Sequence, residues 1–219
     1  MKKFLPPEFM LFDLDNTLYP RHCGLFDEVD ARINRYLAEV VKIPPAEVDS
    51  RRRAYLAAHG TTLNGLIVHH DIDPEDYLDF VHDVPLAAYL KPNPRLKQLL
   101  SALPGRKYIF SNASRAHCRR VLACLELDEV FAEIFDLNYF KLRPKPEPAI
   151  YHELLNVIDG RPERGVMIDD LPVNLAPAAA LGLLAVHYHP FPEPAPFPGP
   201  DILSIRSFEE LAGLFETSF

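Results

Sequence analysis

The first part of the chain carries one short, unbroken run of apolar residues that ends at a pair of acids. The run Phe9–Phe12 leads directly into Asp13, and Asp15 follows two residues later. Apolar residues without alternation are typical of a strand that is buried on both faces, as at the centre of a parallel sheet. Alternate side chains of a strand point the same way, so we expect Asp13 and Asp15 to project together beyond its end.

Two carboxylates held this close repel each other, which costs free energy unless a cation lies between them. Oxygen ligands favour Mg²⁺ among the common divalent ions. The stretch therefore predicts a magnesium site at Asp13 and Asp15. The alternative is that both acids only end the strand and cap a turn, where Asp and Asn are common.

The next segment, residues 20–91, has a different periodicity. Apolar residues recur at helical spacing on both sides of the Pro44-Pro45 pair. The stretch 60–65 begins and ends with glycine and predicts a turn, and Asp73 opens a further helix. The pattern predicts a helical domain inserted after the first strand.

Beyond residue 91, short apolar strands alternate with amphipathic helices, one of them expected from about Asn174. This alternation is typical of a doubly wound, Rossmann-like parallel α/β sheet, which binds its ligands beyond the carboxyl ends of the strands. We therefore expect a core of residues 1–19 and 92–219 that carries a helical cap of residues 20–91. The strands of the core after the first are predicted at 107–110, 134–137, 165–168, 183–186 and 202–203.

Polar residues follow several of these strands, and one lysine lies in a loop before a later helix. Together they supply carboxylates for a metal, with hydroxyl, amide and ammonium groups for phosphate oxygens. Phosphoryl transfer needs this combination, because the protein must position the phosphoryl group and stabilise the charge on its oxygens. The set comprises Asp13, Asp15, Thr17, Ser111, Asn112, Lys145, Asp169 and Asp170.

Composition narrows the class of protein. The 219 residues include 48% hydrophobic residues, enough for a sizeable core, and the net charge of −8 argues against a nucleic-acid polymer as partner. No apolar run approaches the roughly 20 residues that a membrane span requires, and we expect a cytoplasmic monomer or homodimer without a membrane anchor. Cys23, Cys118 and Cys124 lack metal-ligand spacing. The proline-rich segment 189–200 predicts an extended spacer rather than a recognition site.

Four of these motifs occur in an order that resembles the haloacid dehalogenase superfamily of phosphohydrolases. They are Asp13-Leu14-Asp15-Asn16-Thr17, Ser111 with Asn112, Lys145, and Asp169-Asp170. Lys145 fits the third motif better than Lys141 does, because Pro-Glu-Pro follows it.

The resemblance implies a role for each matching residue. Asp13 would be the nucleophile that forms an aspartyl phosphate, and Asp15 would be the general acid and base. Thr17, Ser111, Asn112 and Lys145 would bind the phosphate. Asp13, Asp15 through its backbone carbonyl, Asp169 and Asp170 would hold Mg²⁺, and Asn174 replaces a frequent Asp that orients the metal ligands.

Within the superfamily, the chain resembles pyrimidine 5′-nucleotidases with a helical cap between the first two motifs. This likeness is carried by the motif around Asp13, Gly65-Leu66-Ile67 followed by His70, Val81-His82-Asp83, Leu90-Lys91-Pro92, and Ile168-Asp169-Asp170. It implies a small phosphate ester as substrate, a pyrimidine nucleoside 5′-monophosphate. Within the cap, Asn64 and His70 are the expected selectivity residues, although His70 also fits a buried or solvated cap histidine.

Other functions remain open on the sequence. A phosphatase of a sugar phosphate or phosphoglycolate, a phosphomutase and a catalytically silent phosphate-binding regulator would share these motifs. A haloacid dehalogenase would use the same nucleophile, but it needs neither a metal nor an acid two residues further on. Asp15 and the pair Asp169-Asp170 therefore count against a dehalogenase.

Overall fold

The computed structural model describes residues 4–191 and 199–215. The chain divides into two compact units, one of Met1–Pro20 with Lys91–Phe219 and one of Arg21–Leu90. We refer to them as the sheet unit and the helical unit. Most of the proline-rich segment, from 192 to 198, lies outside the described residues. Among the helices that are described, none combines the length and apolarity needed to cross a membrane.

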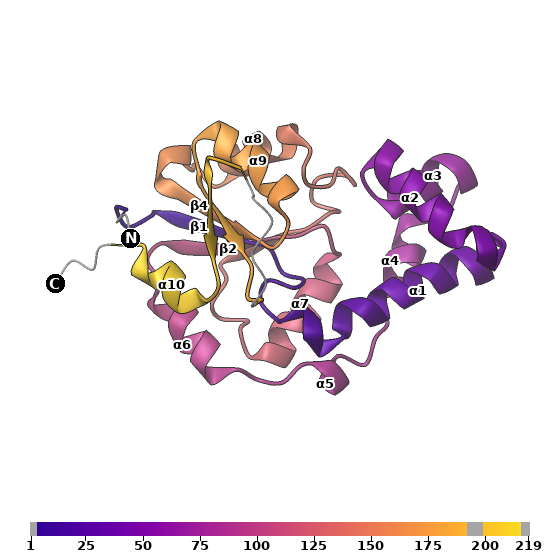
Figure 1. Ribbon diagram of the computed structural model, residues 1–219, viewed down its shortest axis with the longest axis horizontal. Helices are drawn as coiled ribbons and strands as arrows, with labels where there is room; N and C mark the ends of the chain where they lie inside the picture. The colour runs from indigo at the N-terminus through magenta and orange to yellow at the C-terminus, as the bar shows by residue number, and fades with distance from the viewer. Residues whose placement is uncertain (1–3, 192–198, 216–219) are drawn as a thin grey trace. The chain divides into compact units, whose positions relative to one another are not determined.

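The sheet unit is built on six parallel strands in the order β3-β2-β1-β4-β5-β6. Figure 1 labels three neighbours of this order, β2, β1 and β4. Parallel neighbours that are joined by helices define a doubly wound sheet, so the predicted Rossmann-like α/β core is confirmed. The strands are β1 (Phe9–Phe12), β2 (Arg106–Phe110), β3 (Glu133–Phe135), β4 (Gly165–Asp169), β5 (Leu184–Tyr188) and β6 (Ile202–Ile205).

Strand β1 lies at the centre of this sheet. All four of its residues are buried, and it pairs with β2 on one side and β4 on the other. Phe12 is in register with Ile109 and with Ile168, and the Asp13 N–H continues the ladder by donating to the Ile168 carbonyl at 2.9 Å. The pairing of β1 with its neighbours therefore fixes the position of the Asp13 backbone at the end of the strand.

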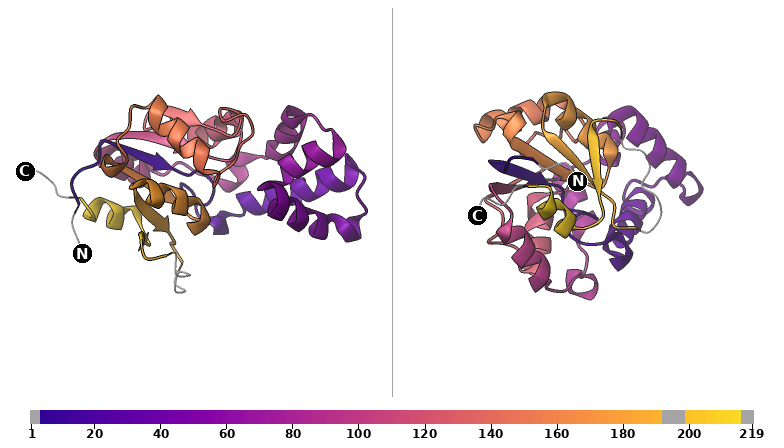
Figure 2. Two further views of the ribbon diagram at one scale, coloured as in Figure 1. Left: turned by 90° about the horizontal axis from the view of Figure 1, so that it is seen from above. Right: turned by 60° about the vertical axis from the view of Figure 1, so that its left-hand side comes forward.

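Helices cover both faces of the sheet, as Figures 1 and 2 show. Phe9 and Leu11 belong to a core cluster with residues of α8 and α9, whereas the Phe12 ring lies 6.2 Å from the Phe208 ring of α10. Alternate residues of β1 thus pack into hydrophobic cores on opposite faces of the sheet. The helices of the sheet unit are α6 (Pro94–Ala102), α7 (Arg115–Leu125), α8 (Pro148–Val157), the 3₁₀ turn η3 (Pro162–Arg164), α9 (Pro172–Leu181) and α10 (Phe208–Gly213).

Helix α9 begins two residues earlier than the sequence predicts, at Pro172 rather than near Asn174. Proline is favoured at the first helical position, where its missing N–H is not needed. Asn174 therefore lies in the first turn, and Pro177 lies inside the helix.

The helical unit packs α1 against α2 and α4, and α2 against α3. The ring of Tyr36 on α1 meets the ring of Tyr77 on α4 edge to face, at 5.0 Å between centroids. Its elements are η1 (Arg21–Cys23), α1 (Leu25–Glu39), η2 (Pro45–Glu47), α2 (Val48–His59), α3 (Thr62–His70), α4 (Pro74–His82) and α5 (Leu86–Tyr89).

The turn predicted for residues 60–65 is wrong in most of its length. Gly60 ends α2 with a φ of 78°, and Thr61 then caps α3 by accepting a hydrogen bond from the Asn64 N–H at 3.0 Å. A Cβ on Gly65 would lie 2.3 Å from Cγ of Tyr55. Gly65 is thus small because two helices approach there, and a glycine that serves helix packing gives the same local pattern as one in a loop.

Candidate active site

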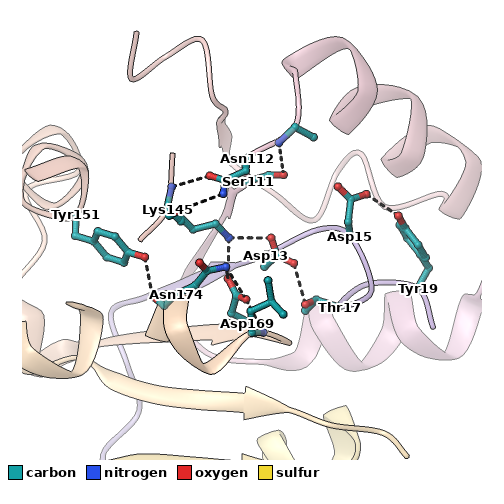
Figure 3. A network of polar contacts seen from close by, with 12 residues as sticks. Asp13, Asp15, Thr17, Tyr19, Ser111, Asn112, Lys145, Tyr151, Asp169 and Asn174 are labelled. Atoms are coloured by element: carbon teal, nitrogen blue, oxygen red, sulfur yellow. Dashed lines mark hydrogen bonds and ion pairs between the residues drawn. The ribbon is translucent and has the colours of Figure 1, made fainter. Parts of the chain in front are cut away.

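Asp13 stands at the carboxyl end of β1 and is 7% exposed. After Asp15 the chain turns at Asn16, whose φ of 62° is one that Asn tolerates better than most residues. The turn brings Thr17 back toward the strand, and its hydroxyl donates to Asp13 Oδ2 at 3.0 Å. Figure 3 shows Asp13 between Thr17 on one side and Lys145 on the other.

Lys145 joins two carboxylates within the buried site. Its Nζ donates to Asp13 Oδ1 at 2.8 Å and to Asp169 Oδ2 at 2.7 Å. Asn112 holds the lysine backbone on both sides: the Lys145 N–H donates to Asn112 Oδ1 at 2.7 Å, and Asn112 Nδ2 donates to the Lys145 carbonyl at 3.1 Å. Asn112, from the second predicted motif, therefore fixes the backbone of Lys145, which is the third motif.

Asp169 and Asp170 at the end of β4 have different surroundings. Both oxygens of Asp169 accept from Asn174 Nδ2 at 3.1 Å, and Oδ1 also accepts the Leu171 N–H at 2.9 Å. His187 Nε2 lies 3.1 Å from the Asp170 backbone carbonyl, to which it donates. Asp169 is thus fully buried and committed to protein donors, whereas Asp170 is partly buried with its backbone held in place.

Asp13, Asp169 and Asp170 form a candidate metal cluster. Each offers one carboxylate oxygen, and these oxygens lie within 4.8 Å of one another. The cluster is made of oxygen donors alone, which suits a hard cation such as Mg²⁺. The Lys145 ammonium group pairs with Asp13 and Asp169, and a divalent cation would supply further positive charge among the three acids.

The charges of this cluster shift one another's titration. Burial raises the pKa of Asp13 well above its usual range, Lys145 opposes this, and Asp169 and Asp170 add to it. Burial, and then the neighbouring Asp169 carboxylate, raise the pKa of Asp170 to about 7. Burial alone would lower the pKa of Lys145, but the Asp13 and Asp169 carboxylates outweigh it and raise that pKa. The lysine is therefore charged. A cation that binds beside the acids would stabilise their ionised forms.

Asp15 is held apart from the lysine network. Its Oδ1 accepts the Tyr19 hydroxyl at 2.6 Å and lies 3.2 Å from His117 Nε2 (Figure 3 shows the tyrosine). Sequence patterns did not indicate either partner. Tyr19 follows the first motif, but His117 lies far along the chain on α7, and only the fold brings it to Asp15.

The remaining predicted residues lie in two places. Ser111 is 3% exposed at the end of β2, where its Oγ accepts the Ala113 N–H at 3.0 Å. Asn64 and His70 belong to the helical unit. Asn64 Nδ2 donates to the His59 carbonyl at 3.3 Å, and His70 Nε2 lies 2.7 Å from the Tyr55 hydroxyl. The structure thus gathers the predicted core residues at one edge of the sheet and gives both selectivity residues contacts inside their own unit.

The fold and this site define a class of doubly wound α/β proteins with an aspartate at the end of the central strand. A family model described as haloacid dehalogenase-like hydrolase matches residues 9–182. The chain therefore belongs to the haloacid dehalogenase-like hydrolases, and the predicted superfamily is confirmed.

A curated relative is phosphate metabolism protein 8 of Saccharomyces cerevisiae, 26% identical over 190 residues. These cover 78% of this chain and 58% of the relative, so the chain spans somewhat more than half of that protein's length.

Solved structures share the fold. The magnesium-bound HAD-hydrolase YfnB of Bacillus subtilis matches with a TM-score of 0.61 and 20% identity, over 95% of this chain and 98% of that one. The L-2-haloacid dehalogenase of Xanthobacter autotrophicus with covalently bound chloropropionic acid matches with a TM-score of 0.60 and 16% identity, over 95% and 98%. At these identities the likeness concerns the fold alone.

Proposed function

We propose that this protein is a Mg²⁺-dependent phosphomonoesterase that acts through an aspartyl-phosphate intermediate. The observation that carries the proposal is the pair of acids after β1, which have separate surroundings. Asp13 is bound to Lys145 inside the carboxylate cluster, and Asp15 is held outside it by Tyr19 and His117. Two acids with different partners suit two chemical roles, nucleophile and general acid.

In the first step, an Asp13 oxygen attacks phosphorus and the ester oxygen leaves with a proton from Asp15. In the second, Asp15 takes a proton from water, which attacks the phosphorus, releases phosphate and regenerates the Asp13 carboxylate. Lys145, Thr17 and Ser111 are the donors we assign to the phosphate oxygens. Bound Mg²⁺, held by Asp13, Asp170 and the Asp15 carbonyl, would stabilise negative charge on those oxygens.

On the basis of their contacts, we propose positioning roles for three further residues of the expected site. Asn112 spends its amide on the Lys145 backbone, so we give it the task of positioning that lysine. Asp169, bound to Lys145, Asn174 and the Leu171 N–H, orients the lysine and adds negative charge beside the metal ligands. Asn174 then acts by fixing Asp169.

For the substrate class we propose a nucleoside 5′-monophosphate, with a pyrimidine base as the first candidate. The support is the resemblance of the first motif and of the segment from Gly65 to His70 to pyrimidine 5′-nucleotidases, together with the phosphate-metabolism relative in yeast. In this proposal the helical unit is the cap that selects the leaving group, since the acids and the lysine handle only phosphate and metal.

A haloacid dehalogenase is the second candidate, because two of the structural neighbours are named 2-haloacid dehalogenases. It would use Asp13 to displace halide from carbon. That chemistry gives no task to Asp15 as an acid or to a cation at Asp170.

One panel separates the candidates. The protein is incubated with Mg²⁺ and nucleoside 5′-monophosphates, sugar phosphates, phosphoglycolate or L-2-chloropropionate, and released phosphate and chloride are measured. We expect phosphate from at least the nucleotides, lost when EDTA removes the metal. Chloride release without phosphate release, or phosphate release that EDTA leaves intact, would overturn the proposal.

A further inference from the structure

Two buried side chains that the reaction scheme does not use meet at one oxygen of Asp15. Tyr19 is 2% exposed and His117 is 1% exposed, and both reach Oδ1. A buried hydroxyl or ring N–H without a hydrogen-bond partner costs free energy, so buried donors are almost always paired. Here the acceptor of both donors is Asp15 Oδ1. The chain thus directs two buried donors to a single atom of a residue that is only partly buried.

Both contacts have a defined direction. An ionised carboxylate can only accept, so the Tyr19 hydroxyl and His117 Nε2 donate to Oδ1. Two donors occupy the two lone pairs of that oxygen. When Asp15 takes up a proton, the favourable place for it is therefore Oδ2.

The framework around His117 keeps the ring in place. Its backbone N–H donates to the Ser114 hydroxyl, which caps α7, at 3.3 Å. The next residue after the cap, Arg115, donates its N–H to Asp136 Oδ2 at 2.9 Å. The Ser114 and Asp136 side chains thus fix the first turn of α7, and this turn determines where the His117 ring lies relative to Asp15.

We infer that His117 and Tyr19 are positioning residues that hold Asp15 with Oδ1 saturated and Oδ2 carrying the transferable proton. The inference rests on the proposed phosphatase reaction and adds which residues make Asp15 an effective acid. In the first step, a bond forms between an Asp13 oxygen and phosphorus, the bond between phosphorus and the ester oxygen breaks, and the proton moves from Asp15 Oδ2 to the departing oxygen.

This role predicts a dependence on the leaving group. An alkoxide such as the 5′ oxygen of a nucleoside is a poor leaving group and needs the proton as it departs. p-Nitrophenolate is stable as an anion and needs it much less. Misplacing Asp15 should therefore slow nucleotides far more than p-nitrophenyl phosphate, whereas a general loss of structure would slow both alike.

The test compares kcat/KM for the preferred nucleotide and for p-nitrophenyl phosphate, at saturating Mg²⁺, in four variants of the full chain. His117→Ala and Tyr19→Phe remove one donor each. His117→Gln keeps an N–H near the position of Nε2. His152→Ala, on the exposed face of α8, is the matched control.

We expect His117→Ala and Tyr19→Phe to lower nucleotide hydrolysis by about 10-fold or more, a share of the usual worth of general acid catalysis. p-Nitrophenyl phosphate should change by less than about threefold, His117→Gln should recover most of the loss, and His152→Ala should match the wild type. Tyr19→Phe keeps the buried ring, so it reports on the contact even where His117→Ala folds poorly.

Equal losses on both substrates in His117→Ala and Tyr19→Phe would assign these residues to structure and overturn the inference. The inference is also overturned if neither variant lowers kcat/KM for the nucleotide. A wild-type protein that hydrolyses neither ester would instead overturn the proposed function, so the two failures are distinguishable.

Discussion

The candidate site at the edge of the sheet and the surface of the helical unit place their charged side chains in different environments. In the sheet unit, the Lys145 side chain is 1% exposed and bridges two carboxylates that are also buried. In the helical unit, ion pairs such as Arg51 with Glu47 and Arg35 with Glu39 join exposed side chains. Removing one partner of a buried pair costs several kcal/mol, whereas an exposed pair contributes about 0–1 kcal/mol.

This difference indicates where a single substitution should have the largest effect on activity and stability. At the carboxyl edge of the sheet Asp13, Lys145 and Asp169 are linked to one another, so one substitution among them disturbs the charge balance of the whole cluster. In the helical unit, the exposed ion pairs of Arg51 with Glu47 and of Arg35 with Glu39 each join only residues four positions apart in the chain, so we expect substitutions of these residues to act weakly. The predictions below test this contrast.

The largest effect should come from Asp13→Asn. The change removes the attacking charge while keeping the shape of the side chain, so turnover of phosphate esters should fall by several orders of magnitude, roughly 10⁴-fold or more. Substrate should still protect the variant against thermal unfolding. Single-turnover assays and melting curves would check both points, and activity within tenfold of wild type would exclude Asp13 as the nucleophile.

A second effect concerns metal and pH at Asp170. Its pKa of about 7, raised by burial and by Asp169, means that the folded protein keeps a proton that the unfolded chain loses near pH 4. The metal-free protein therefore loses this contribution to its free energy of unfolding as pH rises from about 4 to 7. Asp170→Asn should remove that loss.

Differential scanning fluorimetry would measure this. Without metal, the melting temperature of Asp170→Asn minus that of wild type should grow between pH 5 and pH 8. Excess Mg²⁺ should raise the wild-type melting temperature more at pH 8 than at pH 5, and should hardly change the variant. A difference that stays constant over this range would show that Asp170 does not titrate there.

The smallest effect should appear in the helical unit. Asn64→Ala and His70→Ala should change the ranking among nucleotides by about two- to tenfold, since single contacts to a leaving group rarely discriminate more. Hydrolysis of p-nitrophenyl phosphate should stay within about twofold. His22→Ala, an exposed residue of the same unit, is the control. A parallel loss on all substrates, or an unchanged ranking, would remove both residues from substrate selection.

The sheet and the site at its edge could largely be predicted from the sequence, because they depend on local signals. An apolar run that stops at an acid marks β1 and Asp13, and the same signal marks β4 and Asp169. Parallel strands end at a common edge, so separate short motifs could be combined without knowledge of the side-chain contacts.

The partners of these residues could not be predicted in the same way. The bonds of His117 to Asp15 and of Asn112 to Lys145 depend on how a helix and a loop are rotated against the strand ends, and no sequence spacing encodes this. Gly65 was misinterpreted for a related reason. A glycine at a helix contact is recognised only when the facing residue, Tyr55, is known.

The position of β1 in the sheet also has a consequence for synthesis of the protein. Its hydrogen-bonding neighbours, Arg106–Phe110 and Gly165–Asp169, lie far along the chain, and the whole helical unit is translated before either of them. A nascent chain can thus form its contiguous helical unit while β1 still waits for both partners, since contacts near in sequence form sooner. A ribosome that stalls before residue 165 would release a chain that contains Asp13 but has no carboxylate from β4 to place beside it.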